Sequence, residues 1–131
     1  MTTPTLRIDG LRIGGIPSLY GELNRVFMPD EDWTLGESLD ALDDLLYGGF
    51  GVLDGAAPVR VVWADHAVSA EALGVAATRA WYAAKLARPD VYAAGPARRA
   101  LDALDAGTGA TYFALVREVF AGHPNITLVL E

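Results

Sequence analysis

Apolar and polar positions along the chain predict three short strands. Residues 5–9 alternate with period two, and residues 58–63 and 125–130 are brief β-branched runs of the kind found in buried strands. The segments between these runs have apolar residues at helical spacing. Helix-containing connections permit parallel pairing through right-handed crossovers. The pattern therefore predicts an α/β fold, in which a three-stranded parallel sheet is packed with helices.

The sequence predicts four helices between these strands, in addition to an insertion. Ser18 is expected to cap the first helix, and Gly36 is expected to open a second that runs to Tyr47. A third should begin at Ser69 or Ala70, and the last should follow Thr111 and end at Gly122. Between these last two lies an alanine-rich stretch, residues 75–109, which predicts a helical insertion before the last helix. Its two helical pieces are expected at about 72–87 and 97–105, separated by Pro-containing turns.

Length and composition narrow the class of protein. The 131 residues fit one domain, 1–131. The chain contains no cysteine, which excludes a disulfide scaffold, a zinc ribbon and thiol catalysis. No window is long and apolar enough to cross a membrane, and the first residues lack the features of an export signal, so we expect a cytoplasmic protein.

Charge is strongly asymmetric along the sequence. The net charge is −7, which disfavours direct binding of nucleic acid and favours a basic partner. Residues 18–54 hold nine acids and one base, whereas residues 75–106 hold five bases and three acids. Such asymmetry indicates an electrostatically directed encounter with another protein.

The predicted helix from Gly36 to Tyr47 concentrates these acids. At about 100° per residue, its leucines form one apolar stripe, and Glu37, Asp40, Asp44 and Tyr47 fall on the opposite face, with Asp43 at the rim. Like charges at this spacing repel by a few tenths of a kcal/mol each. Either the face is simply solvated, or the repulsion is offset when a partner binds.

The order of these segments resembles the barstar family of small intracellular ribonuclease inhibitors. Residues 36–46, Gly-Glu-Ser-Leu-Asp-Ala-Leu-Asp-Asp-Leu-Leu, look like the family's central motif, Gly-Glu-Asn-Leu-Asp-Ala-Leu-(Trp)-Asp-x-Leu. Residues 117–120 and 125–130 are similar to the family's last helix and strand, and residues 6–10 to its first strand and turn. The resemblance covers residues 5–73 and 111–131.

This resemblance implies a protein that blocks a ribonuclease active site one-to-one with an acidic helix and the preceding loop. Asp40 and Asp44 match the family's acidic contacts, with Asp44 in the position that enters the phosphate-binding site, and Glu118 matches a contact from the last helix. No cofactor or metal is implied. The expected partner-binding residues are Trp33, Leu35, Gly36, Glu37, Asp40, Asp43, Asp44, Tyr47 and Glu118.

The chain departs from the family in three places. Thr34 and Leu35 stand where the namesake has an aromatic pair, with Trp33 just before them. Asp43 replaces a tryptophan between the two acids, and residues 75–109 are longer than the corresponding segment. These changes affect which nuclease would be bound more than they affect the expected mode of binding.

Other functions remain open on the sequence. Asp40, Asp44 and Glu118 would serve as acid and base groups in an enzyme, if they lined a pocket. An immunity protein for a different nuclease toxin, or a module for another basic protein, would use the same exposed acids. His66 and His123 show no metal-ligand spacing; we expect His66 in a turn and His123 in a solvated loop.

Overall fold

Three parallel strands form the sheet, as the pattern predicted. The computed structural model describes residues 3–131, and its strands are β1 (Thr5–Asp9), β2 (Val59–Ala64) and β3 (Ile126–Leu130). They pair in the order β1-β2-β3, with Trp63 aligned to Ile8 on one side and Leu130 on the other. The predicted α/β class is confirmed.

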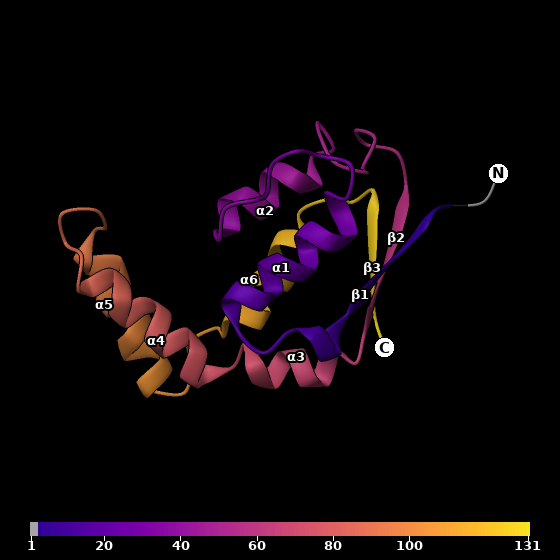
Figure 1. The fold of residues 1–131 in the computed structure, drawn as a ribbon. Coiled ribbons are helices and arrows are strands. Elements are labelled where there is room, and N and C mark those ends of the chain that lie inside the picture. Colours follow the sequence, from indigo (N-terminus) through magenta and orange to yellow (C-terminus); the bar gives the residue numbers. More distant parts are fainter. Residues whose placement is uncertain (1–2) are drawn as a thin grey trace.

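The helices lie on one side of the sheet (Figure 1). A short 3-10 turn, η1, follows β1. The helical elements are η1 (Gly10–Arg12), α1 (Ile16–Phe27), α2 (Leu39–Leu46), α3 (His66–Ala72), α4 (Val75–Leu86), α5 (Ala94–Asp105) and α6 (Tyr112–Ala121).

Within residues 3–131, no helix combines the length and the apolar character needed to cross a bilayer.

The core lies between the sheet and these helices, around the central strand. Trp63 of β2 is fully buried and packs against Phe113 and Phe120 of α6, with ring centroids 5.2 and 6.5 Å away. Its indole Nε1–H donates to Ser69 Oγ at 3.0 Å. All residues of β2 except Arg60 are buried, so the strand is almost continuously apolar, which is why this segment carried a clear signal.

Several helix ends differ from the prediction. Helix α1 begins at Ile16, and Ser18 lies inside it, where its hydroxyl accepts from the Gly14 and Gly15 N–H groups. Helix α3 begins at His66 instead of Ser69 or Ala70. Helix α5 begins at Ala94, three residues earlier than expected. Helix ends depend on which side chain satisfies the free backbone N–H groups, and several residues in each segment offer one.

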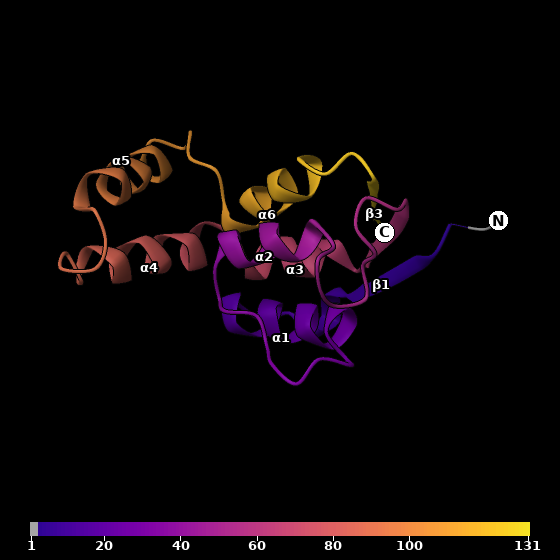
Figure 2. The same cartoon turned by 90° about the horizontal axis from the view of Figure 1, so that it is seen from above.

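The predicted insertion forms a helical hairpin, α4–α5, which projects from the rest of the molecule (Figure 2). Its two helices pack on each other, and an Arg79–Asp105 ion pair links them. At its base, Thr78 Oγ1 accepts from the Tyr112 N–H at 2.7 Å, and the Trp81 ring meets the Tyr112 ring edge-on at 4.8 Å. The hairpin is therefore attached at one end only.

The backbone around Gly10 leaves no room for a side chain. We expect Gly10→Ala to lower the free energy of unfolding by about 1–3 kcal/mol, because its Cβ would collide with the Ala64 carbonyl and lie 2.5 Å from that of Asp65. Gly21→Ala is the matched control: Gly21 occupies an exposed position inside α1, and an added Cβ there meets nothing within 4 Å. We expect Gly21→Ala to raise the free energy of unfolding by about 0.5–1 kcal/mol. Urea unfolding measures both; equal effects would contradict the argument.

Candidate functional site

Helix α2 presents its acids to solvent, as the helical spacing predicted. Leu42, Leu45 and Leu46 are fully buried on one side, whereas Asp40 and Asp44 are exposed on the other. The helix is shorter than expected, because Ser38 caps it: the Ser38 Oγ accepts from the Ala41 N–H at 3.0 Å.

The expected helix start at Gly36 is wrong for the same reason. Ser38 supplies the side-chain oxygen that a first turn needs, which Gly36 lacks. Gly36 and Glu37 therefore lie in the loop before α2, and the helical-wheel position assigned to Glu37 does not apply. Glu37 is nevertheless exposed, next to the first turn of the helix.

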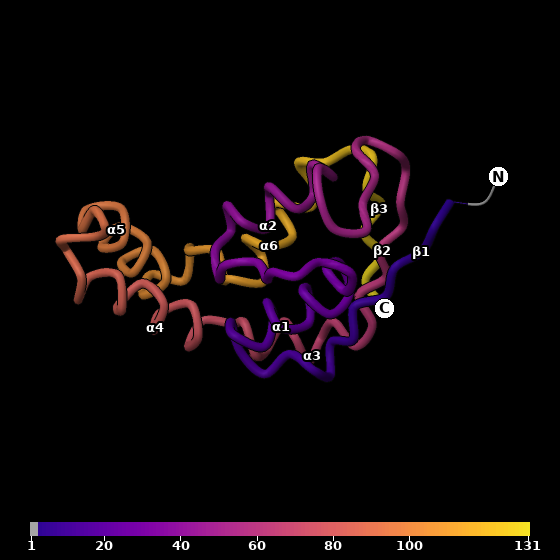
Figure 3. The backbone as a smooth tube through the Cα atoms, turned by 45° about the horizontal axis from the view of Figure 1, so that its top comes forward, coloured from indigo at the N-terminus to yellow at the C-terminus, as the bar shows by residue number. Residues whose placement is uncertain are grey.

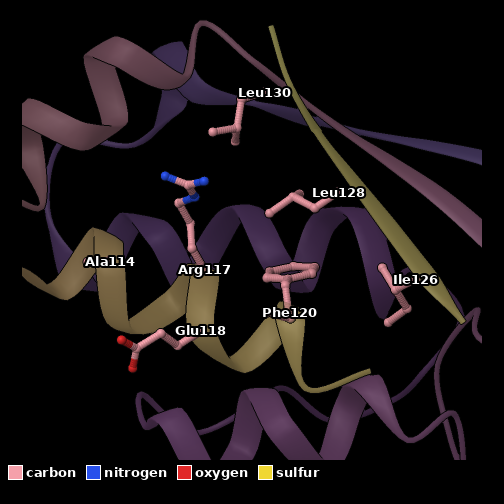
Figure 4. A pocket seen from close by; sticks show the side chains of 8 residues that line it. Ala114, Arg117, Glu118, Phe120, Ile126, Leu128 and Leu130 are labelled. Atoms are coloured by element: carbon pink, nitrogen blue, oxygen red, sulfur yellow. The ribbon is translucent and has the colours of Figure 1, made fainter. Parts of the chain in front are cut away.

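Glu118 joins this acidic side from a second element. Helix α6 packs against α2, and the Glu118 side chain is exposed. In Figure 4, Arg117 points toward Leu128 and Leu130, across a groove of about 500 Å³ between α6 and β3, while Glu118 points away from them.

These carboxylates have no cation to neutralise them. We call the set of four exposed carboxylates the acidic surface: Glu37, Asp40, Asp44 and Glu118. Within residues 3–131, none of these four side chains makes an ion pair or a side-chain hydrogen bond.

Not every acid of this region contributes to the acidic surface. Glu22 is buried, accepts from the Asp9 N–H, and holds the Arg25 guanidinium through two bonds of 2.6 Å. The hydrogen bond to Glu22 raises the pKa of Arg25. Glu31 likewise accepts from the Gly51 N–H at 3.0 Å. Both carboxylates serve the fold.

The loop before α2 divides its side chains between surface and core. Trp33 is 44 % exposed and packs on Phe50, with ring centroids 4.9 Å apart. Leu35 is buried, and its N–H donates to Asn24 Oδ1 at 2.8 Å. Leu35 was expected to contact a partner; its side chain lies in the core and is not available at the surface.

Asp43 makes a contact that sequence reasoning missed. His123 is buried, and its Nε2 lies 2.7 Å from Asp43 Oδ1. The exposed Tyr47 ring meets the His123 ring edge-on at 4.7 Å. The expectation that His123 is a solvated loop residue is wrong, because α2 covers it. Nothing local signals this pair, since 80 residues separate its members.

This pair yields a stability prediction. We expect Asp43→Ala to lower the free energy of unfolding by about 1–3 kcal/mol, because it leaves the buried imidazole of His123 without a partner. Asp40→Ala, on the same helix and unpaired, should change it by no more than about 0.5 kcal/mol. Chemical denaturation of both variants measures the difference. Equal effects would show that the Asp43–His123 contact does not stabilise the fold.

Two tyrosines lie beneath the acidic surface. The hydroxyls of Tyr20 and Tyr112 are 2.6 Å apart and buried, linking α1 to α6. Burial, reinforced by the nearby charge of Glu37, raises the pKa of both groups, so they stay neutral. Glu37 therefore lies close to the point where α1, α6 and the base of the α4–α5 hairpin meet.

The two histidines do not form a metal site with the acids. His66 opens α3, with Nδ1 3.0 Å from the Glu131 carbonyl, so the expectation that it lies in a turn is wrong; the turn is at Asp65, just before the helix. In the part of the chain that the structure describes, no three histidine, aspartate or glutamate side chains gather as a metal-binding group.

No protein-family model matches this sequence, and no curated protein matches it either.

Proposed function

We propose that this chain is a stoichiometric protein inhibitor of a ribonuclease, and that the acidic surface enters the enzyme's active site. The observation that carries the proposal is the set of four exposed, unpaired carboxylates on α2, the loop before it and α6. The resemblance of residues 36–46 to the central motif of the barstar family supports the same function.

Electrostatics explains why such a surface suits this target. A ribonuclease active site concentrates positive charge to hold RNA phosphates, and carboxylates fixed on a helix imitate the negative charge of that backbone. Complementary potentials speed association and suppress wrong partners. Asp44 lies late in α2 and gains nothing from the helix dipole in the free protein. A cationic group of a partner would therefore stabilise its negative charge.

The shape of the site favours binding over acid–base catalysis. A catalytic carboxylate is expected in a cleft that excludes water. Asp40 and Asp44 lie exposed on the outer side of a helix. This arrangement suits insertion into the concave site of another protein.

The neighbouring loop extends the proposed interface. Trp33 supplies an exposed aromatic side chain, and aromatic residues are enriched at protein interfaces. An added Cβ at Gly36 would meet nothing within 4 Å, so the free fold does not require glycine there. A glycine at this position allows the backbone of a partner to approach closely. Tyr47 adds a second exposed ring at the other end of α2.

Calorimetric titration into a small, barnase-like microbial ribonuclease tests the proposal. We expect tight one-to-one binding that weakens as salt is raised, with loss of RNA cleavage at the same stoichiometry. Binding that is insensitive to salt, or that leaves cleavage intact, would contradict it. Absence of binding would favour the alternative, an immunity protein for a different nuclease toxin or a module for another basic protein.

A further inference from the structure

A pocket of about 380 Å³ lies where the α4–α5 hairpin joins the rest of the molecule. Figures 1 and 3 both place the first turn of α1 beside the start of α4, and the loop before α2 completes the wall. The lining residues are Ile16, Pro17, Glu37, Ala77, Ala80 and Trp81.

The pocket is apolar except for one carboxylate. Five lining residues offer carbon surface or the indole ring, and Glu37 is the only charged group among them. Glu37 also belongs to the acidic surface, so the pocket and that surface are continuous.

The wall of the pocket is held in place before any ligand arrives. Trp81 rests edge-on against Tyr112, whose hydroxyl is bonded to that of Tyr20 in the core. The Lys85 ammonium already lies 3.9 Å from the centre of the Trp81 ring. With one cation already at the indole, Glu37 is the group of the lining that offers a charge to a second one.

We infer that this pocket accepts one lysine or arginine side chain of the basic nuclease, placing its charge at Glu37 and its methylene groups against Ala77, Ala80 and Trp81. The inference rests on the proposed function and adds to it a specificity contact supplied by the α4–α5 hairpin. Lysine and arginine combine an apolar stem with a cationic end, which is the combination that this lining complements.

Other occupants match the lining less well. A purely aliphatic side chain would remove water from the Glu37 carboxylate without giving it a partner, which is unfavourable. An acidic side chain would be repelled by Glu37 and by the net charge of −7.

The pocket chemistry is testable without the nuclease. The probes are N-acetyl-arginine amide and the uncharged N-acetyl-norleucine amide, titrated into the full chain while NMR follows the Trp81 indole N–H and the Ala77 and Ala80 amides. We expect saturable shifts with the arginine probe, and binding about ten-fold weaker with the norleucine probe, as for a lost charge-assisted contact.

Variants then assign the contact to its residues. Glu37→Gln should weaken binding of the arginine probe about ten-fold, whereas Asp102→Asn, which changes an exposed acid of α5 outside the pocket, should leave it unchanged. Ala80→Phe, which fills the pocket, should abolish the shifts, whereas Ala83→Phe on the same helix outside the lining should not.

In the probe titrations, three outcomes would overturn the inference: no saturable shift, equal binding of the two probes, or unchanged affinity in Glu37→Gln. None of them bears on Asp44, so the proposed function is judged separately by the nuclease titration. If Asp44→Ala weakens the nuclease complex while Ala80→Phe does not, the inhibitor function stands and the pocket contact fails.

Discussion

Asp44→Ala is expected to weaken binding of the ribonuclease by about 30-fold to several thousand-fold. This range corresponds to the about 2–5 kcal/mol lost when one partner of a buried charge pair is truncated at an interface; the complex of the barstar family's namesake is a known example in which close charge pairs couple strongly. Asp44 is the carboxylate that the resemblance places in the phosphate-binding site. Titration calorimetry and inhibition of RNA cleavage measure the loss.

The same substitution should leave the fold intact. Asp44 is exposed and unpaired, near the C-terminal end of α2, where a negative charge is unfavourable for the helix dipole. Alanine is also the better helix former. The thermal midpoint of Asp44→Ala should therefore equal or exceed that of the wild type, so that lost binding cannot be attributed to unfolding.

A matched control separates a specific contact from a change in net charge. Asp102→Ala removes one exposed acid from the α4–α5 hairpin, away from the acidic surface. It should change affinity little, whereas Asp40→Ala and Glu118→Ala should each weaken the complex less than Asp44→Ala does. Inhibition retained in Asp44→Ala would overturn the proposed mode of binding.

Trp63→Ala is expected to produce the largest loss of stability, about 3–5 kcal/mol. The side chain is fully buried in the central strand, contacts Phe113 and Phe120, and donates a hydrogen bond to Ser69. Its removal leaves a cavity at the centre of the core and takes one hydrogen-bond donor away from the Ser69 hydroxyl, which still donates to the Gly10 carbonyl. Equilibrium unfolding in urea gives the free-energy difference.

Two further tryptophan variants act as controls. Trp33→Ala should cost far less, since that ring is 44 % exposed and packs only along the loop surface. Trp63→Phe keeps much of the volume and loses the indole N–H, so it should fall between the two. A cost for Trp33→Ala as large as that for Trp63→Ala would contradict the assignment of Trp63 as the centre of the core.

The strands and the acidic side of α2 could be predicted because their signals are local. The three strands are short β-branched or alternating runs, and their observed limits differ from the predicted ones by one residue at most. Leucines at helical spacing forced Asp40 and Asp44 to the outer side of the helix. Periodicity of this kind is set by backbone geometry, and it survives whatever the helix packs against.

Helix ends were less predictable, because several residues near each end can satisfy the same backbone groups. Ser18 looked like a cap and instead reaches back from inside α1, while Ser38, which no expectation singled out, caps α2. The choice depends on the conformation of the preceding loop. In α2 that loop is held by the buried Leu35, a tertiary contact.

The sequence by itself determined the α/β fold, the exposed acids of α2 and the presence of a helical insertion before the last helix. Only the tertiary structure decided which acids are free. It bonded Glu22 to the Asp9 N–H, paired Asp43 with the buried His123, and brought Glu118 to the side of α2. It also placed Glu37 beside Trp81 at one pocket. Charge and spacing are local properties of a chain, whereas the pairing of a carboxylate depends on contacts between residues that are far apart in sequence.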